Sequence, residues 1–512
     1  MDNLFEDRCF FPRGPSSRVY PETGPNYEAS RSHIQAIASS LLGRDVSLST
    51  ENLGSTSALS PLPIYNALSS LLPFNSYQTE FFWKKLAKPF ASMIDTAGFT
   101  PAIQCRFLTF VYARVLGMMG PSNENGSNSY MTIDGSPAEL SWVIPRRKVA
   151  KGALTRQVRF AIEPIDPRSG RPLRGSTVLD YLTTTRGSLG GVVTCDKGGM
   201  SWRKSTERFL FPEDDGSEVP EGSRFFVGFD FSQEGNVTLK AYYIPAPSPY
   251  SSSFLSASKS CPMPSPISLW DTDYTAVRKL VSRIDRGLLK PFDNLLSYFD
   301  TLDESHKPRI QILSVDCVRN GQNRLKIYCR PKTGNSWSDA KRSFTLGGRI
   351  EGPVVEHALG RLETLWNNLF PFANSSIDKD LDSMIDSTTY GEENGIKVTQ
   401  NQHPVGGLLY YYSLIAGNET VFPKIYLPVT HYCASDLSIT EAIERFYDDE
   451  EVKISGPDGG ERGQGWVSRE VAKAFDHRKL SEKTGIHTYV TFGLKANGWD
   501  LTSYFSPEPW AS

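Results

Sequence analysis

One pattern occurs five times along the chain: two strand-like runs of residues joined by a turn. Within each run, apolar residues alternate with other residues, which is typical of β-strands. Gly and Asn fill the turn in four of the pairs, as in antiparallel hairpins, and a longer basic loop joins the first pair. We therefore predict five hairpins, at 139–144 with 157–164, 225–231 with 237–245, 309–318 with 324–331, 407–415 with 421–428, and 487–494 with 499–507.

The hairpins recur at a regular distance, with helical patterns around them. Equivalent positions in the second strands lie 78 to 98 residues apart. A ten-stranded antiparallel sheet covered by helices on one face can remove its edges by closing on itself. We therefore expect an α+β fold with ten antiparallel strands in a closed central barrel, surrounded by a ring of helices. The helical patterns span about 32–116, with a kink at Pro89, and then 273–298, 353–369, 436–447 and 468–480.

The repeat also decides the number of domains. A length of 512 residues suggests about three domains at roughly 150 residues each. Repeated units that close one common barrel make a single domain instead. Residues 1–30 are rich in Pro, Gly, Ser and Arg and predict a flexible N-terminal leader. We therefore expect residues 31–512 to form one αββα-repeat barrel domain.

Composition excludes several classes of protein. The 55 Lys and Arg residues nearly balance the 57 Asp and Glu residues, which argues against a nucleic-acid partner or an anionic membrane surface. The most apolar stretch, 107–120, is interrupted by Arg114 and is too short to span a bilayer. The first residues do not look like a secretory signal. Seven scattered cysteines favour a reducing compartment. We therefore expect a cytoplasmic protein.

Three of the second strands carry basic and tyrosine residues two positions apart. Residues i and i+2 share one face of a strand. A single pair of this kind is more simply explained by solvent exposure. The repetition in one register favours the barrel interior, because the outer face is expected to lie beneath helices, where unpaired charges are unfavourable. The residues are Lys240 and Tyr242, Arg324, Lys326 and Tyr328, and Lys424 and Tyr426.

This combination of side chains points to one kind of chemistry. Lys and Arg bind a diphosphate through charge-assisted hydrogen bonds. The faces of tyrosine rings attract an organic cation. A lumen lined by both therefore favours ionisation of an allylic diphosphate, with the carbocation shielded from water.

Several motifs that occur in order show a family resemblance. They are Asp134-Gly-Ser-Pro-Ala-Glu-Leu-Ser-Trp, Val158-Arg-Phe-Ala-Ile-Glu-Pro-Ile, Leu239-Lys-Ala-Tyr-Tyr-Ile-Pro, Arg324-Leu-Lys-Ile-Tyr and Thr345-Leu-Gly-Gly-Arg. From about Leu41 to Pro507 the chain resembles the fungal aromatic (indole) prenyltransferases of the dimethylallyltryptophan synthase family. The resemblance implies the αββα prenyltransferase barrel.

The resemblance also implies roles for single residues. Glu139 matches the glutamate that binds an indole N–H and assists proton removal. Lys495 stands where an arginine is common, so charge is kept but the forked hydrogen bonding is lost. Lys424 stands where family members carry Gln, Lys or similar. The implied diphosphate ligands are Arg159, Lys240, Arg324, Lys326, Lys424 and Lys495, and the implied cation shield is Tyr242, Tyr328, Tyr426, Tyr489 and Tyr504.

No metal site is predicted. Terpene cyclases and isoprenyl diphosphate synthases hold Mg²⁺ on Asp-Asp-x-x-Asp helices. The nearest pattern here, 214–218, lies between prolines and predicts a turn, and 448–452 lacks the spacing. We also interpret the basic run 146–151 as a solvated loop. No cofactor is expected to be required, with Mg²⁺ or Ca²⁺ at most stimulatory.

The expected function is transfer of a dimethylallyl group from dimethylallyl diphosphate to an aromatic acceptor. The resemblance favours an indole or tryptophan-derived acceptor in secondary metabolism, and a monomer or homodimer. Some tryptophan-prenylating members use a lysine on the first strand of the second hairpin, but 224–231 has none, which argues against free tryptophan with C4 chemistry. Phenolic or polyketide acceptors, a longer prenyl donor, C-, N- or O-alkylation and regular or reverse attachment stay open.

Two other classes of protein were weighed against this function. A terpene synthase would be all-helical and rich in Asp, and the five hairpins count against it. A small-molecule carrier could use the same barrel but would not need the cations.

Overall fold

The fold is described from a computed structural model. The structure describes residues 36, 38–40, 62–122, 129, 131–145, 156–183, 189, 191–194, 199–210, 225–244, 274–318, 323–331, 333–384, 392–393, 396–397, 407–448 and 464–511. The expected leader, 1–30, the basic run 146–151 and the acidic run 214–218 lie outside these residues.

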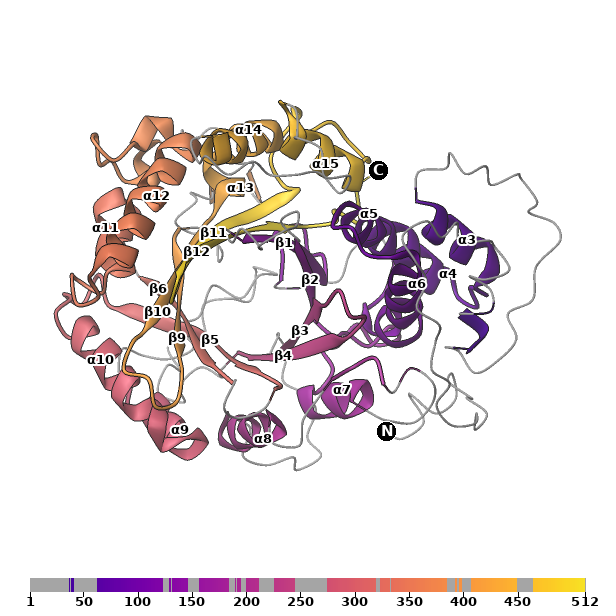
Figure 1. Ribbon diagram of the computed structural model, residues 1–512, viewed down its shortest axis with the longest axis horizontal. Coiled ribbons are helices and arrows are strands. Elements are labelled where there is room, and N and C mark those ends of the chain that lie inside the picture. Colours follow the sequence, from indigo (N-terminus) through magenta and orange to yellow (C-terminus); the bar gives the residue numbers. More distant parts are fainter. Residues whose placement is uncertain are drawn as a thin grey trace.

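Ten antiparallel strands form a closed barrel, seen along its axis in Figure 1. All five predicted hairpins form, and β1 pairs with β12 to close the ring. The barrel order is β1-β12-β11-β10-β9-β6-β5-β4-β3-β2, and the two-residue strands β7 and β8 pair separately. The strands are β1 Ala138–Pro145, β2 Gln157–Ile162, β3 Phe225–Phe231, β4 Val237–Tyr243, β5 Pro308–Asp316, β6 Leu325–Pro331, β7 Glu392–Glu393, β8 Ile396–Lys397, β9 Leu409–Leu414, β10 Phe422–Leu427, β11 His487–Lys495 and β12 Gly498–Phe505.

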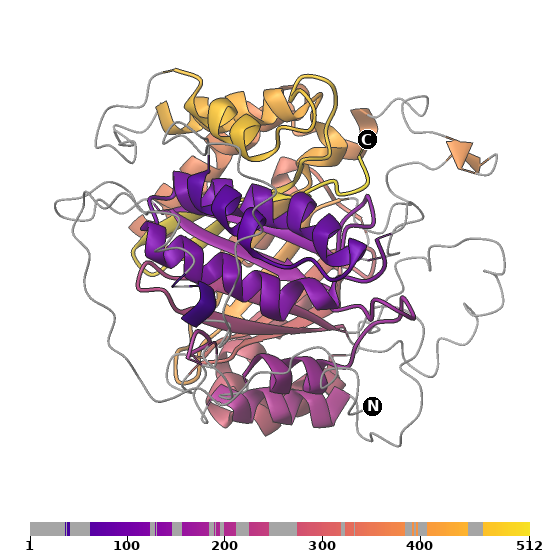
Figure 2. The same ribbon diagram turned by 90° about the vertical axis from the view of Figure 1, so that its right-hand side faces the viewer.

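Helices surround the barrel on its outside (Figure 1). Figure 2 shows the N-terminal helices, in indigo, lying across the outer face of the strands. In the described part of the chain, no helix is long and apolar enough to cross a membrane. The helices are α3 Pro63–Leu71, α4 Tyr77–Phe82, α5 Lys88–Thr96, α6 Pro101–Phe110, α7 Gly175–Leu182, α8 Gly199–Leu210, α9 Thr275–Ile284, α10 Leu289–Phe299, α11 Trp337–Phe344, α12 Pro353–Leu369, α13 Val429–Tyr432, α14 Asp436–Asp448 and α15 Trp466–Ala474.

The helix predictions were right in position but not always in continuity. The pattern 353–369 is α12 with both ends correct. The pattern 273–298 is divided into α9 and α10, because Asp285 is extended (φ −163°) and its carboxylate accepts the Gly287 amide at 2.8 Å. Before Pro89, a π-helical turn at Trp83–Ala87 leads into α5. A proline has no amide to donate, and such a turn accommodates its loss. Helices α7, α8, α11 and α13 were not predicted, and α15 ends at Ala474 whereas the prediction extended to residue 480.

The two faces of the barrel wall differ in chemistry. Along β2, Val158, Phe160 and Ile162 are fully buried on the outer face, and they alternate with half-buried Gln157 and Arg159. The outward residues of the strands join one large apolar core beneath the helices. Because a strand has a period of two, the same alternation turns the polar residues inward. The wall therefore presents polar groups to the lumen, the space that the ten strands enclose.

Candidate active site

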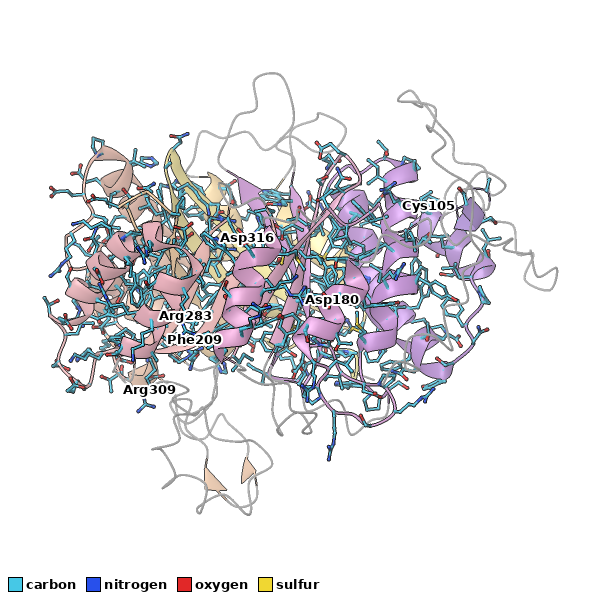
Figure 3. All side chains as sticks on the ribbon, turned by 90° about the horizontal axis from the view of Figure 1, so that it is seen from below. Cys105, Asp180, Phe209, Arg283, Arg309 and Asp316 are labelled. Atoms are coloured by element: carbon cyan, nitrogen blue, oxygen red, sulfur yellow. The ribbon has the colours of Figure 1, made fainter. Side chains whose placement is uncertain are left out.

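The strands carry the predicted residues to two ends of the lumen. Strands β1, β5 and β11 run in the same direction, so their first residues lie at one end of the barrel. Figure 3 shows the barrel from the side, with Asp316 near one end of β5 and Arg309 at the other. The predicted cations lie toward the Asp316 end, which we call the cation end. Glu139 and Tyr489 lie near the starts of β1 and β11, at the opposite end, which we call the tyrosine end.

Three aspartates hold the six predicted cations together at the cation end. Each aspartate contacts two cations, so every acid around the lumen is shared by two bases. The closest contacts are Asp230 with Lys240 Nζ at 2.5 Å and Arg159 Nε at 3.3 Å, Asp316 with Lys326 Nζ at 2.5 Å and Arg324 Nη2 at 2.8 Å, and Asp500 with Lys495 Nζ at 3.0 Å and Lys424 Nζ at 3.6 Å.

These nine side chains carry a formal net charge of +3. Three of the lysines and the aspartates are the deeper members, since the side chains of Lys240, Lys326 and Lys424 are all less than a tenth exposed. Arg324 and Lys495 reach further out and are about a third or more exposed. The cation end has an excess of hydrogen-bond donors and of positive charge. Its most exposed members are Arg324 and Lys495, and this arrangement suits an anion that carries several charges.

Burial and crowding make the three deep lysines weaker bases. Burial lowers the pKa of Lys240 to about 8, with Arg159 adding to the effect and Asp230 and Asp316 opposing it. Burial likewise lowers the pKa of Lys424 to about 7, against the opposing charge of Asp500. Burial would raise the pKa of the aspartates, but the adjacent cations hold it below the usual value.

Two glycines give the large lumen side chains their room. A Cβ at Gly228 would lie 2.9 Å from the ring of Tyr242. A Cβ at Gly493 would lie 2.7 Å from an oxygen of Asp500 and 3.3 Å from the Lys424 stem. Both positions lie opposite lumen residues in the sheet register. Glycine at these positions therefore allows Tyr242, Lys424 and Asp500 to occupy the lumen.

Tyrosine rings line the lumen next to the cations. They form a cluster separate from the main core, together with Leu409 and Ile312. The hydroxyls of Tyr426 and Tyr504 are 3.2 Å apart. All five predicted shield tyrosines belong to this cluster, and Tyr411 is a sixth member. The ring centroids are separated by 6.1 Å for Tyr242–Tyr328, 5.2 Å for Tyr328–Tyr411, 5.9 Å for Tyr328–Tyr426, 5.6 Å for Tyr426–Tyr489 and 5.5 Å for Tyr426–Tyr504.

Glu139 lies at the tyrosine end with one close hydrogen-bond donor. Thr488 Oγ1 donates to its carboxylate at 2.6 Å. Glu139 faces the lumen and is half-buried, and burial raises its pKa to about 8, with the Thr488 hydrogen bond opposing this. Thr488 is held by its neighbour, because Asp436 at the start of α14 accepts the His487 amide at 2.7 Å. The carboxyl therefore lies where a polar hydrogen of a ligand can reach it.

One further cation lies at the tyrosine end. Arg330 follows Tyr328 by two residues on β6 and is half-buried. Its Nη1 donates to the Gly407 carbonyl at 2.7 Å, and its Nη2 donates to the Tyr489 hydroxyl at 3.4 Å. The Gln311 amide oxygen accepts from its Nε at 3.4 Å. Arg330 therefore continues the series of lumen residues on β6 beyond the tyrosines.

Three aspartates, one tyrosine and this arginine were not predicted from the sequence. Asp230 and Asp316 lie near the ends of first strands, whereas the repeat of basic and tyrosine residues lies in second strands. Their signal was available: each has lumen residues two positions before it, Gly228 and Ser314, in the same period of two. Tyr411 pairs directly with Lys424 in the register of the fourth hairpin. Reading the register of each hairpin would have found these residues.

Two other candidate sites were considered. Among the described residues, no group of three His, Cys, Asp or Glu side chains could hold a metal ion. A hollow of about 500 Å³ lies on the outside between α3 and the π-helical turn, where Tyr65, Ser69 and Trp83 line it. Its lining residues come from helices and their connections, and the predicted chemistry lies in the lumen. We therefore take the lumen as the candidate active site.

The sequence is similar to those of known proteins over most of its length. A family profile described as Tryptophan dimethylallyltransferase matches residues 78–453. A 7-dimethylallyltryptophan synthase of Aspergillus fumigatus is 24% identical over 474 residues, covering 88% of this chain and 90% of that protein. A 4-O-dimethylallyl-L-tyrosine synthase of Claviceps purpurea is 25% identical over 445 residues, covering 84% of this chain and 88% of that protein.

A solved structure has the same fold. The crystal structure of NotF in complex with brevianamide F and DMSPP is similar to this chain with a TM-score of 0.62 and 19% identity. The similarity covers 87% of this chain and 99% of that one. The expected closed prenyltransferase barrel is confirmed.

Proposed function

The chain belongs to the tryptophan dimethylallyltransferase family and is an aromatic prenyltransferase, and we propose that it joins dimethylallyl diphosphate to an indole acceptor without a required metal ion. The observation that carries the proposal is that the cation end and the tyrosine cluster lie side by side in one lumen. A cation end of formal charge +3 adjoins a cluster of tyrosine rings, and the half-buried carboxyl of Glu139 lies beyond the rings.

The cation end supports binding of the donor's diphosphate. A diphosphate monoester carries up to about three negative charges at neutral pH, which matches the formal charge of the lumen. Arg159 and Arg324 offer forked donors, and Lys240, Lys326, Lys424 and Lys495 offer point charges. In enzymes that use Mg²⁺ for this step, the ion neutralises the leaving group. Here the side-chain cations are proposed to fill that role.

The tyrosine rings support the next step. When the donor's C–O bond breaks, the electron pair leaves with the diphosphate and an allylic cation remains. Ring faces within 5 to 6 Å of one another can surround such a cation and exclude water. The π electrons of the acceptor ring then form the new bond to the dimethylallyl carbon. The proposed shield is Tyr242, Tyr328, Tyr411, Tyr426, Tyr489 and Tyr504.

Glu139 supports an acceptor with a polar hydrogen. Its carboxylate would accept an indole N–H and orient the ring toward the shielded cation. With a pKa of about 8, it can also take the ring proton after alkylation near neutral pH, which completes the reaction. The lumen positions of β3, Phe226, Gly228 and Asp230, include no lysine. This keeps Glu139 as the proposed proton acceptor.

Arg330 further restricts the chemical class of the proposed acceptor. It lies at the same end as Glu139, beside Tyr489 and Gln311. A guanidinium at this place suits an acceptor that carries a carboxylate or carbonyl group away from the reacting ring. The relatives named above act on tryptophan and tyrosine, and both amino acids carry such a group. We therefore propose an amino acid or a small derivative of one, with an indole ahead of a phenol.

An acceptor panel tests the proposal. Tryptophan, tyrosine, a tryptophan-containing cyclic dipeptide, tryptamine and a hydroxyxanthone are each incubated with dimethylallyl diphosphate in excess EDTA. Products are read by liquid chromatography and mass spectrometry, with geranyl diphosphate as the comparison donor. We expect a dimethylallyl product from an indole amino acid or its derivative. Activity with xanthone alone would overturn the indole acceptor, and loss of activity in EDTA would overturn the metal-independent form.

A further inference from the structure

We propose that Asp316 is a positioning residue for the donor: it keeps the buried Lys326 in its charged form and fixes it beside Arg324. The inference rests on the proposed function, because it assumes that the cation end binds a diphosphate. The proposal explains why Asp316 lies in a site that binds diphosphate, although its negative charge by itself would weaken diphosphate binding. Asp230 and Asp500 occupy equivalent places beside Lys240 and Lys424.

The geometry around Asp316 divides its carboxylate between two partners. Lys326 Nζ donates to Oδ1 at 2.5 Å, and Arg324 Nε donates to Oδ2 at 2.8 Å. The side chains of Asp316 and Lys326 are 5% and 4% exposed, whereas that of Arg324 is 34% exposed. Asp316 therefore joins a deep cation to a shallow one across the β5–β6 hairpin.

Even with Asp316 beside it, Lys326 holds its proton less firmly than an ordinary lysine. Burial lowers its pKa well below the ordinary value, and the nearby charges of Arg324 and Lys240 lower it further. Asp316 is the acid that opposes these effects, both by charge and by hydrogen bond. These three charged groups come from β4, β5 and β6, the strands around Lys326 on that side. On its other side Lys326 pairs with Ser413 of β9.

Removing the charge of Asp316 therefore has two opposite consequences. While Lys326 stays protonated, an Asp316→Asn lumen has one more net positive charge and binds diphosphate more tightly. Once Lys326 loses its proton, which it does at a lower pH in the variant, the lumen lacks that donor and binds more weakly. The binding curves of the two proteins should cross as pH rises. A residue that only supports the fold would weaken binding at every pH.

The experiment measures binding of inorganic diphosphate by calorimetry to the full-length protein. Wild type and Asp316→Asn are titrated at several values between about pH 6 and about pH 9, each in two buffers of different ionisation enthalpy. We expect the variant to bind about tenfold more tightly at the lower limit and about tenfold more weakly at the upper limit. The two-buffer comparison should show extra proton uptake on binding to the variant, since Lys326 regains its proton there.

Control variants separate this role from others. Asp293→Asn removes an exposed acid that pairs with Arg278 and should leave the binding curve unchanged. Asp316→Glu keeps the charge and should restore the wild-type pH dependence. Asp230→Asn should show the same crossing through Lys240, and it serves as the test if Asp316→Asn does not fold.

Each outcome decides between the two proposals. Parallel binding curves without extra proton uptake would refute the role of Asp316, while turnover of an aromatic acceptor by the wild type would leave the proposed function intact. Wild-type protein that binds no inorganic diphosphate would overturn both. Crossing curves in a protein that prenylates no acceptor would support the role of Asp316 and remove only the proposed acceptor chemistry.

Discussion

The two ends of the lumen handle buried charge in opposite ways. At the cation end, six bases pair with three acids, and a formal net charge of +3 remains. At the tyrosine end, the carboxyl of Glu139 lies near Tyr489 and Tyr504, and its close donor is a neutral hydroxyl. Burial penalises the charged form at both ends, but this lowers the pKa of a lysine and raises that of a glutamate.

Burial therefore brings the pKa values of groups at both ends into the same pH range. The pKa values of Lys424 and Lys240 fall to about 7 and about 8, and that of Glu139 rises to about 8. Donor binding is favoured while the lysines are protonated, so it weakens as pH rises through about 7 to 8. Acceptor binding by a carboxylate strengthens as pH rises toward about 8. We therefore expect a bell-shaped profile of kcat/KM against pH, with its maximum between these values.

The largest effect should come from removing a shallow cation. For Arg324→Ala we expect kcat/KM for the donor to fall about a thousandfold, because the leaving diphosphate loses a forked donor where its charge develops. Arg324→Lys should recover part of this loss by restoring charge without the fork. Steady-state kinetics at saturating acceptor measure both. Arg278→Ala, an exposed arginine on α9, is the control. A rise confined to the acceptor KM would contradict the division into two ends.

Removing the acid at the other end should have the next largest effect. For Glu139→Gln we expect kcat/KM for the acceptor to fall about a hundredfold, since the amide still accepts an N–H but cannot take a proton. The rise of acceptor kcat/KM with pH toward about 8 should disappear, because the group that titrates there is gone. A pH series of acceptor kinetics measures this. If the rise persisted in the variant, another group would be responsible for it.

A smaller effect is expected between the two ends, at Tyr411. Its ring is 5.2 Å from that of Tyr328, and Lys424 Nζ is 6.0 Å from the centre of the ring. For Tyr411→Leu we expect about tenfold more dimethylallyl alcohol relative to prenylated acceptor, because water reaches the cation when the ring is lost. Tyr411→Phe keeps the ring and should leave the ratio unchanged. Gas chromatography of the alcohol gives the answer, and equal ratios in all three proteins would exclude Tyr411 from the shield.

Tyr411 also shows where sequence reasoning reached its limit. The run Tyr410-Tyr411-Tyr412 alternates faces, so a strand must place the middle ring opposite the other two. Which face is the lumen depends on the register with Lys424, which pairs with Tyr411, while Tyr410 and Tyr412 are buried beneath the helices. The hairpins themselves were predictable because turns and alternation are local. Which residue of the neighbouring strand lies opposite a given side chain could not be predicted from the local pattern alone.

The same limit applies to the acids of the cation end. A Lys-x-Tyr repeat in three strands is visible as a repeat, but Asp316 and Asp500 gain their meaning from cations on neighbouring strands. Asp500 lies opposite Gly493, next to Lys424 in the register. The break between α9 and α10 is similar on a smaller scale, because one side chain, Asp285, caps a turn inside a continuous apolar pattern. Pairing between strands decided the first feature, and a local side-chain cap decided the second.

The smallest expected effect is at Arg330, the cation of the tyrosine end. For Arg330→Gln we expect kcat/KM for tryptophan to fall about fivefold, because a half-buried charged hydrogen bond to its carboxylate is replaced by a neutral one. Tryptamine lacks the carboxylate and should be almost unaffected, so the ratio of the two acceptors is the measurement. The donor KM should not change, and Arg342→Gln on α11 is the matched exposed control. Equal losses for both acceptors would mean that Arg330 supports Tyr489 and the barrel wall, and the tyrosine end would then select its acceptor through Glu139 and the rings alone.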